Sequence, residues 1–333
     1  TVQQKWALAS KLGDLVSQPG FAATFLPRGR APEVGERFEM PPAARALRLI
    51  GATRGEAFYR GEIGAAIAGW SREHGGAMTE ADLAAFRPEW VEPLAQDYRG
   101  HTLHEIPPNG QGIAAQMALG MLAHFDLAAL PVDGPECQHL QIEAMKLAFA
   151  DAYRFVADRA HMEGPAERLL DAGYLASRAK LIDAKRAQHF GPGPAFAGGT
   201  IYLATADESG MMASFIQSNY MGFGSGVVEP TFGISLQNRG AGFSMQERHP
   251  NVVAPGKRPF HTIIPAFLTR DGAPQMGFGI MGGHMQPQAH VQTLVRMLDH
   301  RQHPQAACDA PRWRVNDGLE INVERHMPRA TID

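Results

Sequence analysis

Thr200 is the residue of this chain whose type and position best fit nucleophilic chemistry. It follows Gly198-Gly199 and opens a strand-like run over residues 200–206. The preceding stretch, residues 191–199, is rich in glycine and proline, so it is expected to be exposed and mobile. A cut before Thr200 would give one residue both a hydroxyl nucleophile and an amine base. The alternative is an ordinary β-branched residue at the start of a buried strand.

Segments on both sides of Thr200 form a recognisable pattern. Residues 207–210 predict a turn before a second strand-like run over 211–219. The order and spacing of the segments resemble the γ-glutamyltransferase (γ-glutamyltranspeptidase) family of N-terminal-nucleophile hydrolases, and in particular its branch with cephalosporin acylases. The resemblance covers nearly the whole chain. The segments that carry it are residues 98–100, 107–112, 143–151, 220–228, 233–238, 255–259 and 279–283.

The resemblance implies an α+β fold, a four-layer αββα sandwich of the N-terminal-nucleophile hydrolase type. Residues 1–199 would form the C-terminal part of a large (alpha) subunit that ends in the flexible linker. Residues 200–333 would form a small (beta) subunit that begins at the nucleophile. Together they would make one structural domain, truncated at both ends relative to the family. The implied partners are the two subunits from one precursor and a small-molecule amide substrate, and a homodimer of the processed pair stays open.

The resemblance also implies the catalytic groups. Self-cleavage would occur between Gly199 and Thr200, after which Thr200 supplies hydroxyl and amine. Gly282 and Gly283 would form the oxyanion hole, because glycines let two backbone N–H groups approach the developing charge. Their alternative is a plain strand-to-helix turn. Ser218 aligns with a family threonine whose hydroxyl bonds the nucleophile, and its alternative is a solvent-facing strand serine.

Several substrate-binding positions depart from the transpeptidase pattern. An aspartate that pairs with the substrate's α-ammonium group is replaced by Gly242, and a neighbouring glutamine by Arg239. These changes favour a donor with a carboxylate but no ammonium, such as a glutaryl amide. The substrate-binding candidates are Tyr220 in place of an asparagine, Asn238, Arg239, and His261 with Thr262 in place of a serine pair.

The length of one loop predicts whether water or an amine accepts the acyl group. Residues 244–256 form a shorter segment than the one that carries the lid in many transpeptidases. A shorter lid leaves the site open to water, which favours hydrolysis over transfer. The family arginine that binds the donor carboxylate would precede residue 1.

Composition excludes several other classes. The chain has 333 residues, of which 44% are hydrophobic and 20% charged, with a formal net charge of −3. No basic stripe indicates nucleic acid as a partner, and no apolar run reaches the ~18–20 residues of a membrane span. The two cysteines make no disulfide framework and leave the compartment undecided. No metal-binding motif is present and no cofactor is implied. Ser225 lacks the first glycine of a nucleophile elbow, so it is not expected to react.

The pattern predicts helices before Thr200 and strands after it, followed by a last helix. A capping box is expected at residues 79–82. Helices are predicted over 41–54, 62–73, 113–125, 138–157, 167–184 and 288–300, and strands over 99–106, 253–268 and 275–281.

The leading prediction is an autoprocessing N-terminal-threonine amidohydrolase or acyltransferase that cleaves γ-glutamyl or glutaryl-like amides. A cephalosporin (glutaryl) acylase on the same scaffold is the alternative among enzymes. An alternative of another class is a catalytically silent precursor or binding protein, because the chain runs unbroken through Gly199 and Thr200.

Overall fold

The computed structural model describes residues 2–191 and 199–333. They form two compact units, of which the first comprises Thr1–Trp90 and Asn219–Asn238 and the second Val91–Ser218 and Arg239–Asp333. The central residues of the predicted linker lie outside the described residues. The predicted subunit boundary before Thr200 falls inside the second unit, and the division into large and small subunits stays a prediction.

The first unit consists mainly of short helices around two small apolar clusters. One cluster centres on Phe21 and Phe25, against which the indole of Trp6 packs edge-on. The other includes Ile63 and Ile67. The elements of this unit are α1 (Val2–Ala9), α2 (Gly13–Val16), α3 (Phe21–Phe25), α4 (Pro41–Ala52), α5 (Glu56–Arg60), α6 (Glu62–Glu73), α7 (Glu80–Ala85), β5 (Val228–Glu229) and β6 (Ile234–Ser235).

Two helices and the cap predicted for this unit are confirmed. Helix α4 ends two residues before the predicted boundary, and α6 matches its predicted limits. At the start of α7, the backbone N–H of Asp82 donates to Thr79 Oγ1 at 3.2 Å, and the Asp82 carboxylate accepts from the Thr79 N–H at 2.8 Å. This reciprocal pair satisfies two backbone donors that the helix would otherwise leave unpaired.

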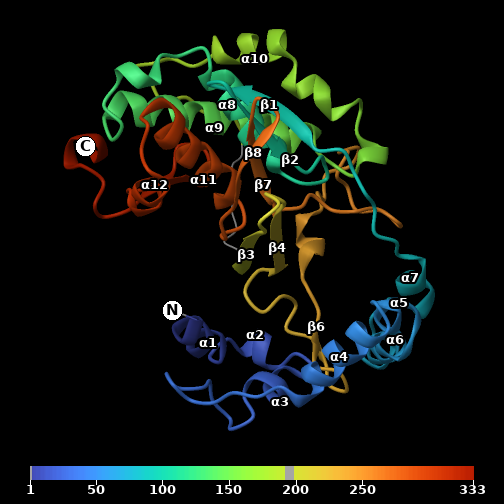
Figure 1. The fold of residues 1–333 in the computed structure, drawn as a ribbon. Helices are drawn as coiled ribbons and strands as arrows, with labels where there is room; N and C mark the ends of the chain where they lie inside the picture. Colours follow the sequence, from blue (N-terminus) through green and yellow to red (C-terminus); the bar gives the residue numbers. More distant parts are fainter. Residues whose placement is uncertain (1, 192–198) are drawn as a thin grey trace. The chain divides into compact units, whose positions relative to one another are not determined.

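The second unit is built on an antiparallel sheet of order β1-β2-β7-β8, with α8 packed on β1 and β2 and α9 packed against α8 (Figure 1). Every residue of α8 is buried, as expected for a helix apolar on all sides. Its helices are α8 (Gly112–Leu122), α9 (Pro135–Phe155), α10 (Ala172–Ala179), α11 (Met285–Leu294), α12 (Pro304–Asp309) and α13 (Arg329–Ile332). Its short helical turns are η1 (Leu127–Ala129), η2 (Arg159–His161), η3 (Ala166–Leu170), η4 (Arg239–Gly242) and the π-helical η5 (Val295–Asp299). Its strands are β1 (Leu94–Tyr98), β2 (His101–Glu105), β3 (Gly199–Ala206), β7 (Ala266–Arg270), β8 (Ala273–Phe278), β9 (Trp313–Val315) and β10 (Ile321–Val323), and β4 (Met212–Tyr220) crosses the unit boundary.

The predicted strand over 99–106 begins later than expected, at His101. Arg99 and Gly100 have φ values of 50° and 76° and form the two-residue turn between β1 and β2. Two positive φ angles are typical of the tightest hairpin turns. Asp299 at the end of η5 holds this turn, because it accepts hydrogen bonds from Arg99 Nε at 2.8 Å and from the Tyr98 hydroxyl at 2.7 Å.

Three other predicted boundaries are wrong. The helix over 167–184 is divided into η3 and α10, because the Asp171 carboxylate accepts from the Tyr174 N–H and caps a new helix. The strand over 253–268 is confined to β7, since Pro255 and Pro259 supply no backbone donor to a ladder. The helix over 288–300 begins earlier, as α11, and continues into the π-helical η5.

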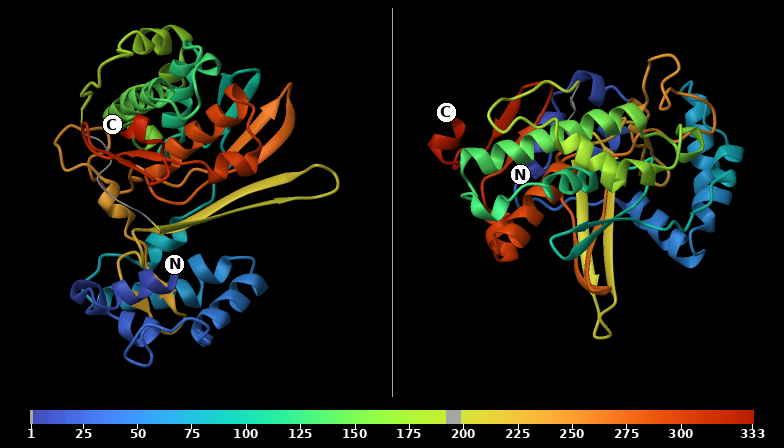
Figure 2. Two further views of the ribbon diagram at one scale, coloured as in Figure 1. Left: turned by 90° about the vertical axis from the view of Figure 1, so that its left-hand side faces the viewer. Right: turned by 90° about the horizontal axis from the view of Figure 1, so that it is seen from above.

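Strands β3 and β4 form the predicted hairpin, seen as a long two-stranded ribbon in Figure 2. The Asp207 carboxylate closes its turn by accepting from the backbone N–H groups of Ser209 and Met211. The expectation of a buried strand is wrong for one face of the hairpin, because Ile201 is 55% exposed and Phe215 is 49% exposed. The structure confirms a mixture of helix and sheet, whereas the four-layer sandwich stays a prediction.

No helix in the described ranges is long and apolar enough to span a lipid bilayer. Cys137 is buried in α9 and Cys308 is exposed in α12, and both carry free thiols.

Candidate functional site

Gly282 and Gly283 form a turn between β8 and α11. Their φ values of 127° and 61° lie in the region that favours glycine. The Gly282 carbonyl accepts from the Met285 N–H, and the Gly283 carbonyl accepts from the Gln286 N–H. Within the described part of the chain, no hydrogen bond takes up the N–H of either glycine. This is a strand-to-helix turn, and it also leaves two adjacent amides at the positive end of a helix.

The side chain of Gln111 connects this glycine turn to a second loop. Gln111 is buried at the N-cap of α8, and its Nε2 donates to the carbonyls of Thr262 at 2.6 Å and Gly283 at 2.9 Å. Its backbone N–H donates to the His261 carbonyl at 2.9 Å, and the His261 N–H donates to the Asn109 carbonyl at 2.9 Å. Sequence reasoning marked the 107–112 segment as a family feature without assigning these contacts.

Arg239 lies in the same group of residues and is 7% exposed. Its Nη1 donates to Thr262 Oγ1 at 3.2 Å, and its Nη2 donates to the backbone carbonyl of Ser218 at 3.3 Å. The structure therefore brings Ser218, Arg239 and Thr262 together, as the prediction of one site requires. Through Gln111, these residues are linked to Gly283.

Two histidines, the partly buried His261 and the buried His284, are held in the neutral form. Burial, followed by the positive charge of Arg239, lowers the pKa of His261 to about 3. Burial, with a smaller effect of Arg314, lowers the pKa of His284 to about 4. The ring nitrogen Nδ1 of His284 lies 2.9 Å from the Tyr153 hydroxyl and 3.1 Å from Gln111 Oε1.

Gly242 ends η4, and its surroundings explain why it carries no side chain. A Cβ atom at this position would lie 2.5 Å from the Phe260 carbonyl oxygen, which is closer than real Cβ contacts. The Gly242 carbonyl accepts from Asn251 Nδ2 at 2.7 Å, and Asn251 Oδ1 accepts from the Phe260 N–H at 3.0 Å. This backbone cannot take the aspartate of γ-glutamyl enzymes without moving.

Two substrate-binding candidates belong to the first unit. Tyr220 is buried at the end of β4 with a φ of 78°, which is uncommon for a bulky residue. Asn238 Oδ1 accepts from the Met221 N–H at 3.0 Å. Their placement beside the candidates of the second unit stays a prediction.

Thr200 is partly buried and lies at the second position of β3. Two residues later, the Tyr202 ring covers Gly279, where an added Cβ would lie 2.5 Å from Tyr202 Cδ2. A Cβ atom added at Gly277 would have side-chain atoms of Ser214, Tyr202 and Ala204 as its nearest neighbours. Strand β3 and the 277–279 segment therefore run antiparallel past each other.

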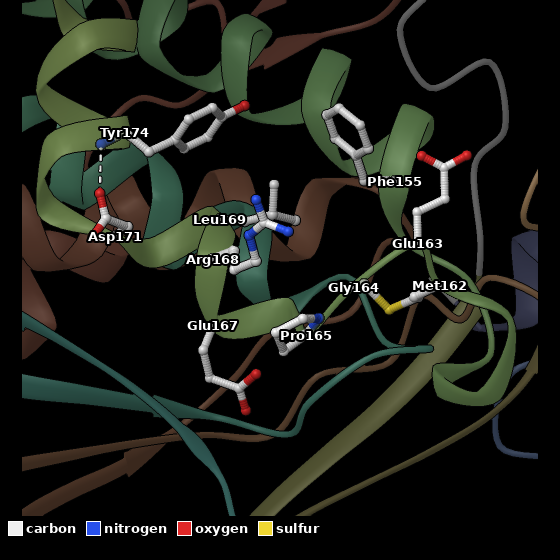
Figure 3. A pocket seen from close by; sticks show the side chains of 10 residues that line it. All are labelled: Phe155, Met162, Glu163, Gly164, Pro165, Glu167, Arg168, Leu169, Asp171 and Tyr174. Carbon is white, nitrogen blue, oxygen red and sulfur yellow. Dashed lines mark hydrogen bonds between the residues drawn. The ribbon is translucent and has the colours of Figure 1, made fainter.

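The cavity shown in Figure 3 is separate from these residues. It has a volume of about 760 Å³ and lies between the end of α9 and the start of α10, with Phe155, Arg168 and Tyr174 in its wall. None of the residues proposed from the sequence lines it. Ser225 is engaged in its own loop, where its hydroxyl donates to the Leu236 carbonyl at 2.8 Å. Across the described residues, no group of three histidine, cysteine or acidic side chains could hold a metal ion.

Comparison with known proteins gives consistent matches. The sequence model of the gamma-glutamyltranspeptidase family matches residues 1–333. The chain is 39% identical over 301 residues to the glutathione hydrolase-like YwrD proenzyme of Bacillus subtilis (strain 168), which is 90% of this chain and 57% of that protein. It is 37% identical over 313 residues to the oxamate amidohydrolase proenzyme of Klebsiella pneumoniae, which is 94% of this chain and 59% of that protein.

A solved structure agrees with these matches. The crystal structure of cephalosporin acylase from Bacillus halodurans superposes with a TM-score of 0.91 and 46% sequence identity, over 99% of this chain and 62% of that chain. The chain therefore spans about 57–62% of the length of these three proteins.

The depressed pKa of His284 predicts a pH-dependent stability. Between its ordinary value of 6.5 and its folded value of about 4, the folded state binds fewer protons than the unfolded chain. The free energy of unfolding should therefore fall as pH drops through this window, with His284 contributing a loss of about 2 kcal/mol at pH 5. His284→Asn should remove this part of the pH dependence in urea unfolding at pH 7 and pH 5.

The matched control is His326→Asn, because His326 is exposed near the C-terminus. An unchanged pH dependence in the His284→Asn variant would contradict the assignment of a buried neutral imidazole.

Proposed function

Because the chain belongs to the gamma-glutamyltranspeptidase family, we propose that the full-length protein is an autoprocessing amidohydrolase with Thr200 as its nucleophile. The observation that carries this proposal is the antiparallel approach of β3 to the segment that leads into Gly282 and Gly283. The proenzyme names of the relatives support self-cleavage before Thr200.

The contact between Tyr202 and Gly279 also indicates where Thr200 lies, two residues earlier on β3. Thr200 lies on the same strand face as Tyr202, about 7 Å further along β3. In an antiparallel arrangement this step follows the chain from Gly279 toward residues 281–282. The covering of Gly279 by Tyr202 therefore supports a position for the Thr200 hydroxyl beside the glycine turn.

In the proposed reaction, the Thr200 hydroxyl attacks the carbonyl carbon of an amide and its proton passes to the free amine of the same residue. The negative charge that develops on the carbonyl oxygen is stabilised by the N–H groups of Gly282 and Gly283. The protonated amine then gives its proton to the leaving amine, and an ester to Thr200 forms. Water attacks this ester, releases the carboxylic acid and restores the hydroxyl. Ser218 is proposed to bond the nucleophile through its hydroxyl.

The acyl donor is proposed to carry a carboxylate and no α-ammonium group. Arg239 supplies a buried positive charge beside Thr262, and a guanidinium favours a carboxylate partner. The close contact at Gly242 leaves no room for an aspartate that would bind an ammonium group. Oxamate, which the name of one relative identifies as a substrate, is an amide with a carboxylate and no ammonium. A glutaryl amide has the same chemistry, in line with the cephalosporin acylase neighbour.

Water is the proposed acyl acceptor. The loop over 244–256 is closed on itself, with the Ser244 N–H donating to the Asn251 carbonyl at 2.9 Å. A loop tied down in this way is less able to act as a lid over the acyl-enzyme, so water keeps access to the ester.

We also propose that a further layer covers the exposed face of the β3–β4 hairpin in the full-length protein, completing the four-layer sandwich. Ile201, Leu203 and Phe215 are each more than 40% exposed on this hairpin. Apolar side chains on one sheet face usually pack against another layer.

One test of this proposal concerns Thr200. In the full-length protein, Thr200→Ala should stay a single band on a denaturing gel and should lose amide hydrolysis, because hydroxyl and amine are both needed at this position. The control is Thr205→Ala, since Thr205 is an exposed threonine of the same strand. It should be cut and should keep its activity. Cleavage of the Thr200→Ala chain into the same two fragments would point to a separate protease, whereas a wild-type chain that stays a single band would favour the silent-precursor alternative.

A further test of the proposal concerns the substrates, for which glutaryl, γ-glutamyl and butyryl p-nitroanilides are compared. The processed enzyme should prefer the glutaryl compound, and Arg239→Met should lower kcat/KM for it about 10- to 100-fold, the size of one charge-assisted bond. The neutral butyryl compound should change far less, whereas a general structural defect would affect both equally. Added glycylglycine should raise the rate little.

Good turnover of the γ-glutamyl compound with no turnover of the glutaryl one would show that the donor class is wrong. A strong rate increase with glycylglycine, with little free acid formed, would show that transfer dominates.

A further inference from the structure

We propose that Gln111 is a positioning residue for the amide-cleaving reaction. Its carboxamide fixes the glycine turn at 282–283 and ties that turn to the loop that carries Thr262. The inference rests on the proposed function, because it assigns a role within the same site. It concerns a segment, residues 107–112, whose side chains the proposed mechanism does not otherwise use.

The glycine turn needs an external anchor. Two consecutive glycines have wide conformational freedom, so their N–H groups can point in several directions at little cost. The carbonyl of Gly283 is held from two sides, by Gln111 Nε2 at 2.9 Å and by the Gln286 N–H at 3.2 Å. Fixing this peptide group restricts the dihedral angles that set the direction of the neighbouring N–H.

The same side chain sets the distance to the proposed donor loop. Gln111 Nε2 also donates to the Thr262 carbonyl at 2.6 Å, and the hydroxyl of Thr262 accepts from Arg239. One carboxamide thus joins the residues proposed to bind the donor carboxylate to those proposed to bind the oxyanion. A change of about 1 Å between two such groups can cost two orders of magnitude in rate.

The hydrogen-bond partners of Gln111 determine which way its carboxamide is oriented. Its two N–H groups are both used by carbonyls, so Oε1 must accept. Oε1 lies 3.1 Å from Nδ1 of His284, so this orientation of the carboxamide assigns the proton of the neutral ring to Nδ1, and the Tyr153 hydroxyl 2.9 Å away then accepts from the same N–H. His284 directly follows Gly283, so this bond holds the end of the turn as well. Helix α8 begins directly after Gln111 and α11 directly after His284, and the two helices lie side by side (Figure 1).

A merely structural role is the competing explanation, and the chain offers a matched control for it. Gln116 lies on the same helix, is equally buried, and also donates through Nε2 to two backbone carbonyls, those of Leu94 at 2.7 Å and Leu103 at 3.1 Å. These carbonyls belong to β1 and β2, and these two strands contain none of the residues proposed for the reaction. Gln116→Met therefore removes the same kind of interaction away from the site.

The experiment compares Gln111→Met, Gln111→Asn and Gln116→Met in the full-length protein. Activity is measured as kcat and KM for glutaryl-p-nitroanilide and expressed per free Thr200 terminus, so that incomplete processing does not count as slow catalysis. Both Gln111 variants should lower kcat about 10- to 100-fold with KM changed less than about 3-fold, because the oxyanion contact acts in the transition state. Gln116→Met should keep kcat within about 2-fold while lowering the melting temperature to a similar extent as Gln111→Met.

The Asn variant keeps the amide but is one methylene too short to reach both carbonyls, so it tests the role even if Gln111→Met does not fold. The inference would be overturned if both Gln111 variants kept kcat, if only KM rose, or if Gln116→Met lowered kcat to the same degree. A wild-type protein that is neither processed nor active would instead remove the proposed function, and this result is visible before any variant is made.

Discussion

The buried carboxamide of Gln111 is the contact on which the arrangement of the second unit's site depends. It connects three stretches that are far apart in the sequence, namely the start of α8, the loop at 261–262 and the turn at 282–283. A single β-bridge between Gly110 and His261 joins the first two stretches through their backbones, and the carboxamide adds the bond to the turn at 282–283. A buried side chain with two donors and one acceptor can do this because each bond replaces one that water would otherwise make.

The titratable side chains near this contact differ in charge. Arg239 is buried and charged, whereas burial and that same guanidinium hold His261 neutral. His284, next to Gly283, is held neutral mainly by burial. Neither imidazole therefore adds a positive charge beside the Arg239 guanidinium. A substrate carboxylate is proposed to pair with that guanidinium, and the proposed contacts of the oxyanion are the backbone dipoles of Gly282 and Gly283.

The sequence predicts the local elements well and their contacts poorly. The helix at 62–73, the capping box at Thr79 and the β3–β4 hairpin follow from periodicity and turn chemistry, which act over a few residues. The division at Asp171 and the late start of β2 at His101 depend on a single cap and on two positive φ angles, which the periodicity does not report. The grouping of Ser218, Arg239 and Thr262 was expected from the family resemblance alone. The role of Gln111 could not have been found in that way. Its partners are backbone carbonyls, which every residue has, so the identities of the residues do not reveal the contact.

The central claim is that the hydroxyl of Thr200 faces the amides of Gly282 and Gly283. The most direct measurement is a crystal structure of the processed, full-length protein with an acyl group trapped on Thr200 Oγ1. The account predicts that the acyl carbonyl oxygen lies about 2.7–3.1 Å from the amide nitrogens of both glycines. An acyl group carried by another residue, or a carbonyl oxygen more than about 4 Å from both amides, would contradict it.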